Sequence, residues 1–414
     1  MTSSPISPRP GRSGLLPGWW FCLCLVMLLG CRPAVATDIP GIPAAPADGH
    51  EAWLLTFGPG EIYFESFGHN AIWLREPAVG LDHTFNFGNF AFEQRDFFVR
   101  FLRGRMLYFS LAQPAQMDFE IYRQENRSIR AQKLRLSAEE YQRMRDYLLN
   151  EILPENSSYR YDYYLNNCST RIRDALDIAL GGALHERSAQ VPAKLNFRDQ
   201  TRRLTENQFW TYLGLETALG YPVDRPVTRW DEMFIPMVVA DEVAALSADS
   251  GGKLVESDTM VYTSTLPAPQ EMPTPVWSRY LLTGLLIAGL AWLSGRFMPP
   301  VWLRGLCLAW VLVSATLGLA LAALWLFTDH QFSRENANLL LLNPLMLLAM
   351  LPGLRRPGAI LLAAGNVLAF VLLLLPEHQY NLDVLALLTP LNLGVAFYLY
   401  RSGTAGRVEQ HVLG

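Results

Sequence analysis

Hydrophobic and polar positions divide the chain of 414 residues into three parts. Residues 19–29 form a short apolar run, whereas residues 50–263 mix polar and apolar positions with many aromatic side chains, as in a globular domain. Beyond about residue 280 the chain is overwhelmingly apolar. Residues 264–275 carry four prolines, which is typical of a stiff linker. The pattern therefore predicts a globular domain followed by a membrane domain.

The apolar C-terminal part contains five segments that we expect to cross a membrane: 280–295, 305–327, 339–354, 359–375 and 384–400. Several are shorter than the ~20 residues that a bilayer normally requires. Pro344, Pro352 and Pro390 interrupt three of the segments or their ends. Because irregular backbone in lipid has to be covered by protein or face a cavity, we expect some of these spans to be broken.

Arginines predict the orientation of these spans. Six of them fall on one side: Arg296, Arg304, Arg355, Arg356, Arg401 and Arg407. The other side has little beyond Arg279 and Arg334. Since cytoplasmic loops are enriched in Lys and Arg, the larger group is expected in the cytoplasm. The globular domain before residue 280 then lies outside the cytoplasm.

The N-terminus has the order of a secretory signal. Arg9 and Arg12 precede the apolar run, and small residues follow it. Cleavage after the A-V-A run at 34–36 is one interpretation, and retention as an anchor is another. The L-L-G-C run at 28–31 also fits a lipobox, in which Cys31 would be lipidated. We therefore expect residues 1–36 to be a signal peptide or N-terminal anchor.

The remaining boundaries follow from the same pattern. The exported domain is expected over 37–263, a Pro-rich linker over 264–278 and the membrane domain over 279–414. Within the exported domain we expect strands at 52–57, 63–74, 83–88, 105–112 and 128–136, and helices at 94–102, at 137–150 and from Cys168 onward. Ser137 and Glu140 have the spacing of a capping box. These elements predict an α+β domain with an antiparallel sheet and packed helices.

The five cysteines single out one residue. Cys22, Cys24 and Cys31 lie in or beside the signal, and Cys307 lies in an expected span. Only Cys168 remains in the exported domain, so that domain cannot hold an internal disulfide. An unpaired cysteine in an oxidising compartment is a candidate reactive thiol, although a lone cysteine is more often a small buried residue.

The residues around Cys168 favour the reactive interpretation. Asn167 is a suitable N-cap, and an apolar helical period follows it, which places Cys168 in the first turn of a helix. There the helix dipole and unpaired N–H groups favour a thiolate and lower the pKa of the sulfur. Arg171 and Arg173 add positive charge nearby. We therefore expect a nucleophilic thiolate.

A nucleophilic thiol needs a base. The exported domain offers His50, His69, His83 and His185. His69 is the best candidate, because a histidine on a strand facing a cysteine on a helix defines papain-like sites. The alternative is a core histidine satisfied by backbone. His83 remains open as the base or as a third member of the site, and His185 is expected at the surface.

Five segments of the sequence resemble the Lnb N-terminal periplasmic domain family: F-G-H-N-A at 67–71, F-N-F-G at 85–88, E-N-R at 125–127, P-E-N at 154–156, and the segment 161–174, which contains Y-D-Y and N-C-S-T-R-I-R-D. The resemblance is dense from 53 to 174 and thins toward 255. The order of His before Cys also resembles the circularly permuted papain-like folds of lecithin retinol acyltransferase.

Named members of this family are lipoprotein N-acyltransferases, which move an acyl chain within a diacylated lipoprotein to its N-terminal amine. The resemblance implies Cys168 as nucleophile and His69 as base. Asn86 matches the family pattern and is expected to orient the imidazole, unless it only ties down its strand. Arg127 and Arg171 match as well and are expected to hold the domain together.

The loop between the second and third expected spans lies on the same side as Cys168. It carries three polar residues, His330, Asn336 and Asn338, beside a Pro-containing span. Exposed there, they would hold a phosphate or glycerol head group of the substrate. The alternative is a solvated loop with a helix cap.

These observations predict a membrane-bound cysteine acyltransferase that acts on lipoprotein or phospholipid acyl esters through a thioester, on the periplasmic side of a bacterial cytoplasmic membrane. The alternatives are a cell-wall amidase or endopeptidase of papain-like type and a catalytically inactive sensor or assembly protein. Membrane lipids and lipoproteins are the expected partners. The net charge of −4 gives no reason to expect nucleic acid. No cofactor is expected, and no metal, because the Cys and His positions lack zinc-ligand spacing.

Overall fold

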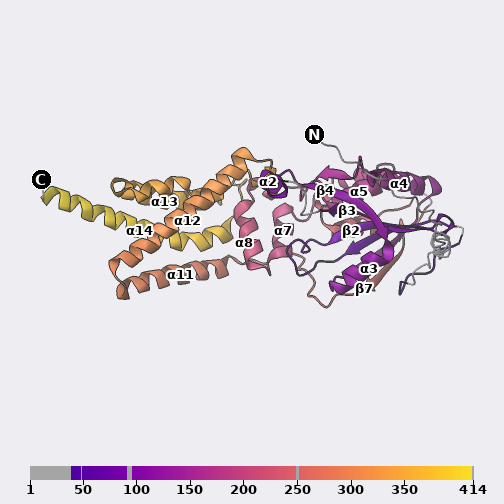
Figure 1. Cartoon of the computed structure of the whole chain (residues 1–414), viewed down its shortest axis with the longest axis horizontal. Helices are drawn as coiled ribbons and strands as arrows, with labels where there is room; N and C mark the ends of the chain where they lie inside the picture. The colour runs from indigo at the N-terminus through magenta and orange to yellow at the C-terminus, as the bar shows by residue number, and fades with distance from the viewer. Residues whose placement is uncertain (1–38, 48, 91–95, 249–250, 413–414) are drawn as a thin grey trace, which may run out of the picture.

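The computed structural model describes residues 39–412 except 48, 91–95 and 249–250. A sheet flanked by helices forms one end of the molecule, and long helices form the other (Figure 1). The expected signal or anchor over 1–36 lies outside the described residues. The predicted α+β domain followed by a helical membrane domain is confirmed.

The sheet has seven antiparallel strands in the order β6-β4-β3-β2-β1-β5-β7. Their bounds are β1 Glu51–Phe57, β2 His69–Glu76, β3 Leu81–Asn89, β4 Leu107–Pro114, β5 Ile129–Leu134, β6 Ser158–Arg160 and β7 Val255–Tyr262. Strands were expected near the first five of these. The second begins six residues later than predicted, because Gly68 has a positive φ of 81° that ends the preceding turn.

The central strands are buried on both faces. Along β1, Ala52 and Leu54 pack into one core, while Trp53, Leu55 and Phe57 pack into another. Since successive side chains of a strand point to opposite faces, this alternation requires helices on both sides. The first core is closed by α4 (Ala138–Glu151) and α5 (Cys168–Ala179), and the second by α3 (Ala115–Gln124).

Two helix starts follow the predicted capping chemistry. Ser137 and Glu140 form the expected capping box at the start of α4, and Asn167 and Thr170 form one at the start of α5. The other helices of this part are α2 Phe97–Arg103, α6 Ala183–Ser188, α7 Phe197–Thr205, α8 Phe209–Ala218, α9 Arg229–Glu232 and α10 Pro236–Ala244, with 3-10 helices η1 Pro77–Val79 and η2 Tyr221–Asp224.

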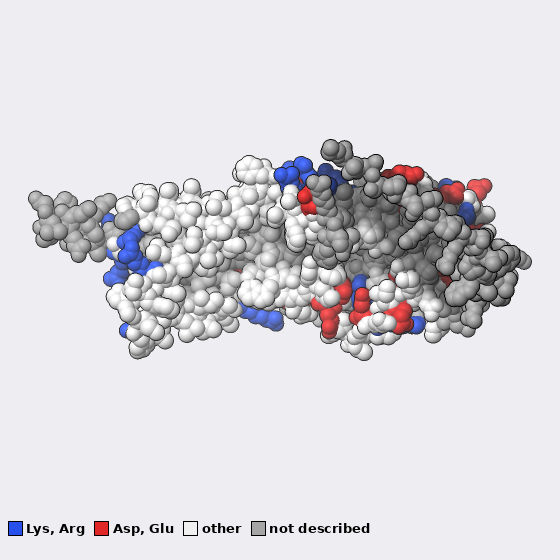
Figure 2. All heavy atoms as spheres, in the orientation of Figure 1, with Lys and Arg blue, Asp and Glu red and all other residues white. Residues whose placement is uncertain are grey.

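Four helices in the described part of the chain are long and apolar enough to cross a membrane: α11 Trp277–Phe297, α12 Pro300–Phe327, α13 Arg355–Leu372 and α14 Leu382–Val412. Figure 2 shows a surface over these helices that is largely free of charged side chains. The third expected span is broken, consisting of the 3-10 helices η4 Ala337–Leu340, η5 Pro344–Met350 and η6 Pro352–Leu354, after η3 Gln331–Ser333.

The broken segment nevertheless connects the two ends of the bundle. The chain leaves α12 beside the sheet domain, where His330 bonds to the backbone of α2. It enters α13 at the opposite end, where the Arg356 guanidinium lies 5.3 Å from the Tyr400 ring near the far end of α14. Between these points Leu340 and Ala349 lie against Gly365 and Gly358 of α13, which shows an antiparallel path. The segment thus runs the length of the bundle.

Buried ionic and polar contacts join the two parts of the molecule. Arg202 of α7 donates to the carboxylate of Asp383 at the start of α14 (3.0 Å), and the Tyr212 hydroxyl of α8 donates to the same oxygen (2.7 Å). Arg202 and Asp383 are both buried. A buried ion pair with an additional hydrogen bond fixes geometry, because breaking it would leave an unpaired charge. The sheet domain therefore packs directly against the helical bundle.

Candidate active site

Cys168 is the first residue of α5, as expected. Its predecessor Asn167 has extended backbone and accepts a hydrogen bond from the Thr170 N–H (2.9 Å). The Asn167 amide also donates to the Tyr163 carbonyl (3.1 Å) and to the Phe234 carbonyl (3.0 Å). One side chain thus begins the helix and fixes its start against two other segments, which gives Cys168 a defined position.

The start of α5 is pressed against the ends of β2 and β3. Gly88 of β3 has a positive φ of 90°, and a Cβ at this position would lie 3.2 Å from the Cys168 Cβ. The Ser169 hydroxyl donates to Asn70 Oδ1 of β2 (2.7 Å), and both side chains are buried. The backbone N–H groups of Asn70 and Ser169 lie close enough to the Cys168 sulfur to favour its ionised form. These contacts explain the glycine of the F-N-F-G run.

His69 is the residue before Asn70, so the fold brings it to the same strand end as Cys168. Its ring lies beside the stacked rings of Phe57 and Tyr122, whose centroids are 6.0 and 6.1 Å from it and 3.6 Å from each other. The ring Nε2 is 3.0 Å from Asn86 Oδ1. Asn86 lies opposite Ala71 in the antiparallel pair, so Asn86 and His69 are diagonal neighbours on one face of the sheet.

Asp118 of α3 completes this arrangement, and nothing in the sequence pointed to it. The Asn86 Nδ2 donates to Asp118 Oδ2 at 2.8 Å, and Asp118 is buried. Because a carboxylate accepts and does not donate, the amide nitrogen of Asn86 has to face Asp118 and the amide oxygen has to face His69. His69 Nε2 is then the protonated nitrogen, and Nδ1 is free to accept a proton.

Burial sets the charge state of the pair. It raises the pKa of the Cys168 thiol to about 11, although hydrogen bonds from backbone N–H groups and the charge of Arg127 act in the opposite direction. Burial likewise lowers the pKa of His69 to about 4, against the effect of its hydrogen bond to Asn86. The expectation of a thiolate is therefore wrong for this state, because desolvation outweighs the helix dipole. At neutral pH the pair consists of a neutral thiol and a neutral imidazole.

Arg127 and Arg171, which match the family pattern, have different surroundings. Arg127 is buried, donates to the Gly58 carbonyl (2.9 Å) and lies 4.6 Å from the Tyr122 ring centroid. Its charge acts on both Cys168 and His69. Arg171 pairs with Glu151 (3.1 Å) outside the site, consistent with a structural role.

The remaining histidines lie elsewhere. His83 is three residues before Asn86 on β3, which places it about 10 Å away along the strand and on the opposite face. His50 packs against Tyr141 with its ring tilted, and His185 packs edge-on against Trp230. Of the candidates for a third member, only Asn86 contacts His69.

Two of the three polar residues of the outer loop, Asn336 and Asn338, are buried and not exposed as expected, whereas His330 is half-exposed. Asn338 is fully buried and donates to the carbonyls of Glu216 (2.9 Å) and Thr217 (3.1 Å), at the end of α8. Asn336 is buried and donates to the Thr217 carbonyl as well (2.9 Å). His330 Nε2 donates to the Phe101 carbonyl (2.9 Å). These bonds hold the loop to the sheet domain, which is a structural role.

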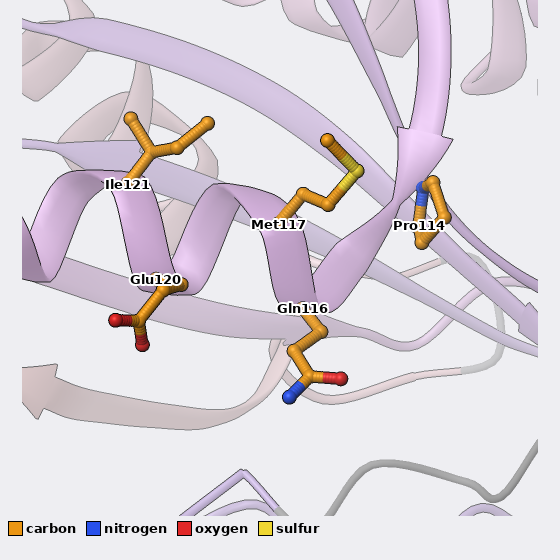
Figure 3. Close-up of a pocket in the computed structure, with 5 residues that line it drawn as sticks. All are labelled: Pro114, Gln116, Met117, Glu120 and Ile121. Atoms are coloured by element: carbon orange, nitrogen blue, oxygen red, sulfur yellow. The ribbon is translucent and has the colours of Figure 1, made fainter.

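A shallow hollow on the outer side of α3 is separate from this site. Figure 3 shows the residues that line it: Pro114, Gln116, Met117, Glu120 and Ile121. Asp118 and Tyr122 lie on the inner side of the same helix, so the hollow contains none of the residues described above. Among the described residues there is no group of three or more His, Cys, Asp or Glu that could hold a metal ion.

Two family models match the chain. Residues 47–207 match the Lnb N-terminal periplasmic domain, and residues 268–357 match the Lnb transmembrane domain. Together the matches cover more than half of the chain and include Cys168, His69, Asn86 and Asp118. No curated protein and no solved structure matches the chain significantly.

Proposed function

Because the chain belongs to the Lnb family, a family of membrane proteins with a periplasmic and a transmembrane domain, we propose that it is a cysteine acyltransferase of the bacterial cytoplasmic membrane. Its donor is an acyl ester of a lipoprotein or phospholipid, and its acceptor is an amine. One observation carries the proposal: Cys168 at a capped helix start shares a strand end with a histidine whose tautomer is fixed by Asn86 and Asp118.

The first half of the reaction forms a thioester. His69 Nδ1 takes the proton of the Cys168 thiol as the sulfur attacks the ester carbonyl. The negative charge on the carbonyl oxygen is stabilised by backbone N–H groups at the start of α5. The bond to the glycerol oxygen then breaks, and the imidazolium returns its proton to that oxygen. The products are an acyl thioester on Cys168 and an alcohol.

The second half releases the acyl chain. An amine attacks the thioester carbonyl, and His69 takes a proton from the amine nitrogen. The carbon–sulfur bond breaks and an amide forms, while the proton returns to the sulfur. Because the imidazole is neutral at the start of each half, it can act as a base at every pH well above 4. A raised thiol pKa is compatible with this scheme, since proton transfer accompanies attack.

A direct test uses the purified full-length protein in detergent micelles with a synthetic diacylated lipopeptide. Fragmentation mass spectrometry of the peptide distinguishes an acyl chain on the glycerol oxygen from one on the N-terminal amine. We expect amide product with the wild type and none with Cys168→Ala.

Cys307→Ala is the matched control, because Cys307 is the other free cysteine of the described residues and lies buried within α12. It should form product at the rate of the wild type. Equal product from Cys168→Ala would overturn the proposal. Cleavage of peptidoglycan fragments without any change in the lipopeptide would instead favour a cell-wall hydrolase.

A further inference from the structure

Several large apolar side chains are exposed on the sheet domain near the helical bundle. They lie on the 61–65 turn, on α2 and on α8: Ile62, Tyr63, Phe64, Phe98, Phe101, Leu102 and Trp210. Phe98 is 76% exposed and Trp210 is 80% exposed. We call these seven residues the apolar collar. Exposed apolar patches of this kind mark a binding surface, because leaving them in water is unfavourable.

One end of the collar is attached where α12 leaves the bundle. The Asp329 N–H donates to the Arg103 carbonyl (2.9 Å), and His330 Nε2 donates to the Phe101 carbonyl (2.9 Å). Figure 1 shows α2 beside the end of α12, between the bundle and the sheet. Since α12 is an expected membrane span, α2 lies where that span reaches the membrane surface.

The other end of the collar is attached to the start of α11. The ring of Phe209 stacks on that of Tyr280, with centroids 5.5 Å apart. Gln208, just before α8, donates to the Ser66 hydroxyl (2.8 Å) and so ties the 61–65 turn to the same helix. Trp210 therefore lies beside the first membrane span, at the level at which tryptophan is enriched in membrane proteins.

Aromatic rings connect the collar with Cys168. Phe90 lies between Phe64 and Phe97, with centroid distances of 6.4 Å to each, and is 5.4 Å from Tyr108. Tyr108 stacks on Tyr161 at 4.0 Å. A charge on Cys168 acts on both tyrosines, so the sulfur lies close to the inner end of this series. A series of aromatic side chains thus extends from the membrane level to the surroundings of the thiol.

Basic residues accompany the apolar face of α2. Arg100 and Arg103 lie on the helix, and Arg103 is exposed. An interfacial helix typically combines apolar side chains with Lys or Arg, because the cations attract anionic lipid head groups. The charge of α2 therefore matches a lipid surface.

We propose that the apolar collar lies in the bilayer leaflet nearest the sheet domain and takes acyl chains from that leaflet toward Cys168. The occupant is the bilayer itself. The attachment of the collar supports this proposal, because both of its ends contact the outer ends of membrane spans. The delivery of acyl chains rests on the function proposed above, whereas the insertion of the collar does not.

Insertion is tested with the full-length protein in vesicles of phosphatidylethanolamine and phosphatidylglycerol. A phosphatidylcholine with a diazirine in the middle of one acyl chain is added and activated by light, and the labelled peptides are identified by mass spectrometry. We expect label on the peptides of α2 and of the 61–65 turn. The peptide containing Val79 is the reference, because Val79 is 62% exposed on η1 and belongs to a turn away from the collar. Labelling of α2 no stronger than this reference overturns the proposal.

Delivery is tested with the variant Phe98→Glu/Leu102→Glu. Both side chains are largely exposed, so the change leaves the fold intact, and Val79→Glu is the matched control. We expect the variant to lose the α2 label and to transfer acyl chains from vesicles about tenfold more slowly, because two carboxylates have to enter the leaflet. Its acylation by water-soluble 4-nitrophenyl butyrate should match that of the wild type.

The outcomes separate the two proposals. Transfer from vesicles at the wild-type rate by the Phe98→Glu/Leu102→Glu variant overturns delivery through the collar. If wild-type Cys168 reacts with neither ester, the acyltransferase function fails, while the photolabel on α2 still decides whether the collar lies in the bilayer.

Discussion

Replacing Asp118 by Leu tests whether the carboxylate sets the tautomer of His69 through Asn86. The change removes the acceptor of the Asn86 Nδ2 bond at 2.8 Å and leaves only the Thr84 hydroxyl at 3.3 Å. The Asn86 amide can then turn and offer Nδ2 to His69, which favours the tautomer with a proton on Nδ1. That tautomer cannot accept the thiol proton.

The expected loss of acylation rate follows from the hydrogen bond that Asp118→Leu removes. A hydrogen bond to a charged group contributes about 1.5–3 kcal/mol, so acylation of Cys168 should slow by about 10- to 150-fold. Asp118→Asn should cost less, because the introduced amide can turn its oxygen to Asn86 if Gln113, the other partner of Asp118, also turns. Glu120→Leu on the exposed side of α3 is the control and should leave the rate unchanged.

The assay is rapid-quench measurement of acyl-enzyme, with thermal unfolding recorded for each variant. If Asp118 acts through Asn86, Asn86→Ala and Asn86→Ala/Asp118→Leu should be equally slow. Additive losses in the double variant, or a rate within threefold of the wild type for Asp118→Leu, would refute the reasoning.

Three other changes test the pKa values, the packing and the path of the chain. Folding lowers the pKa of His69 from the ordinary histidine value of 6.5 to about 4, so the acylation rate at pH 5.5 should stay above about 90% of its neutral value. A fall to about 10% would mean that His69 titrates as an ordinary histidine. Because only the unfolded chain binds this proton between pH 6.5 and 4, the free energy of unfolding should also fall as the pH is lowered through that window. Gly88→Ala should destabilise the fold by about 1–3 kcal/mol and slow acylation, since the new Cβ strains the backbone and contacts Cys168. Gly80→Ala is the control, because it strains a backbone with positive φ in the same way but its Cβ contacts no other atom, so acylation should be unchanged. A reporter that is active only outside the cytoplasm should work after Thr263 and fail after Arg356, and activity after Arg356 would contradict a crossing by the broken segment.

Local sequence signals predicted the start of α5 well. Asn167 before an apolar helical period is a capping signal that acts within one turn, and the structure has the helix beginning at Cys168. The need for a strand histidine facing the helix cysteine suggested His69, and the family resemblance added Asn86, which no local signal distinguishes from other polar strand residues. Asp118 could not be found in this way, because its contact with Asn86 depends on how α3 lies across the sheet.

Predictions that depended on solvent exposure were less successful. Polarity suggested that Asn336 and Asn338 are exposed, yet backbone carbonyls of α8 satisfy them in a buried position. The helix dipole suggested a thiolate at Cys168, yet burial reverses the direction of the pKa shift. The exposure of the two asparagines and the pKa of Cys168 depend on tertiary packing, which cannot be predicted from the sequence around a single residue.

The most direct measurement is the intact mass of the purified protein after rapid quench with a diacylated lipopeptide whose N-terminal amine is acetylated, so that no acceptor amine is present. The account predicts a gain of one acyl chain on Cys168 that neutral hydroxylamine removes, because hydroxylamine cleaves thioesters far more readily than ordinary esters. Cys168→Ala should gain no mass, and His69→Ala should gain it slowly. If the wild type turns over without this mass and Cys168→Ala turns over equally well, the covalent mechanism is contradicted and Cys168 is only a residue at the start of a structural helix.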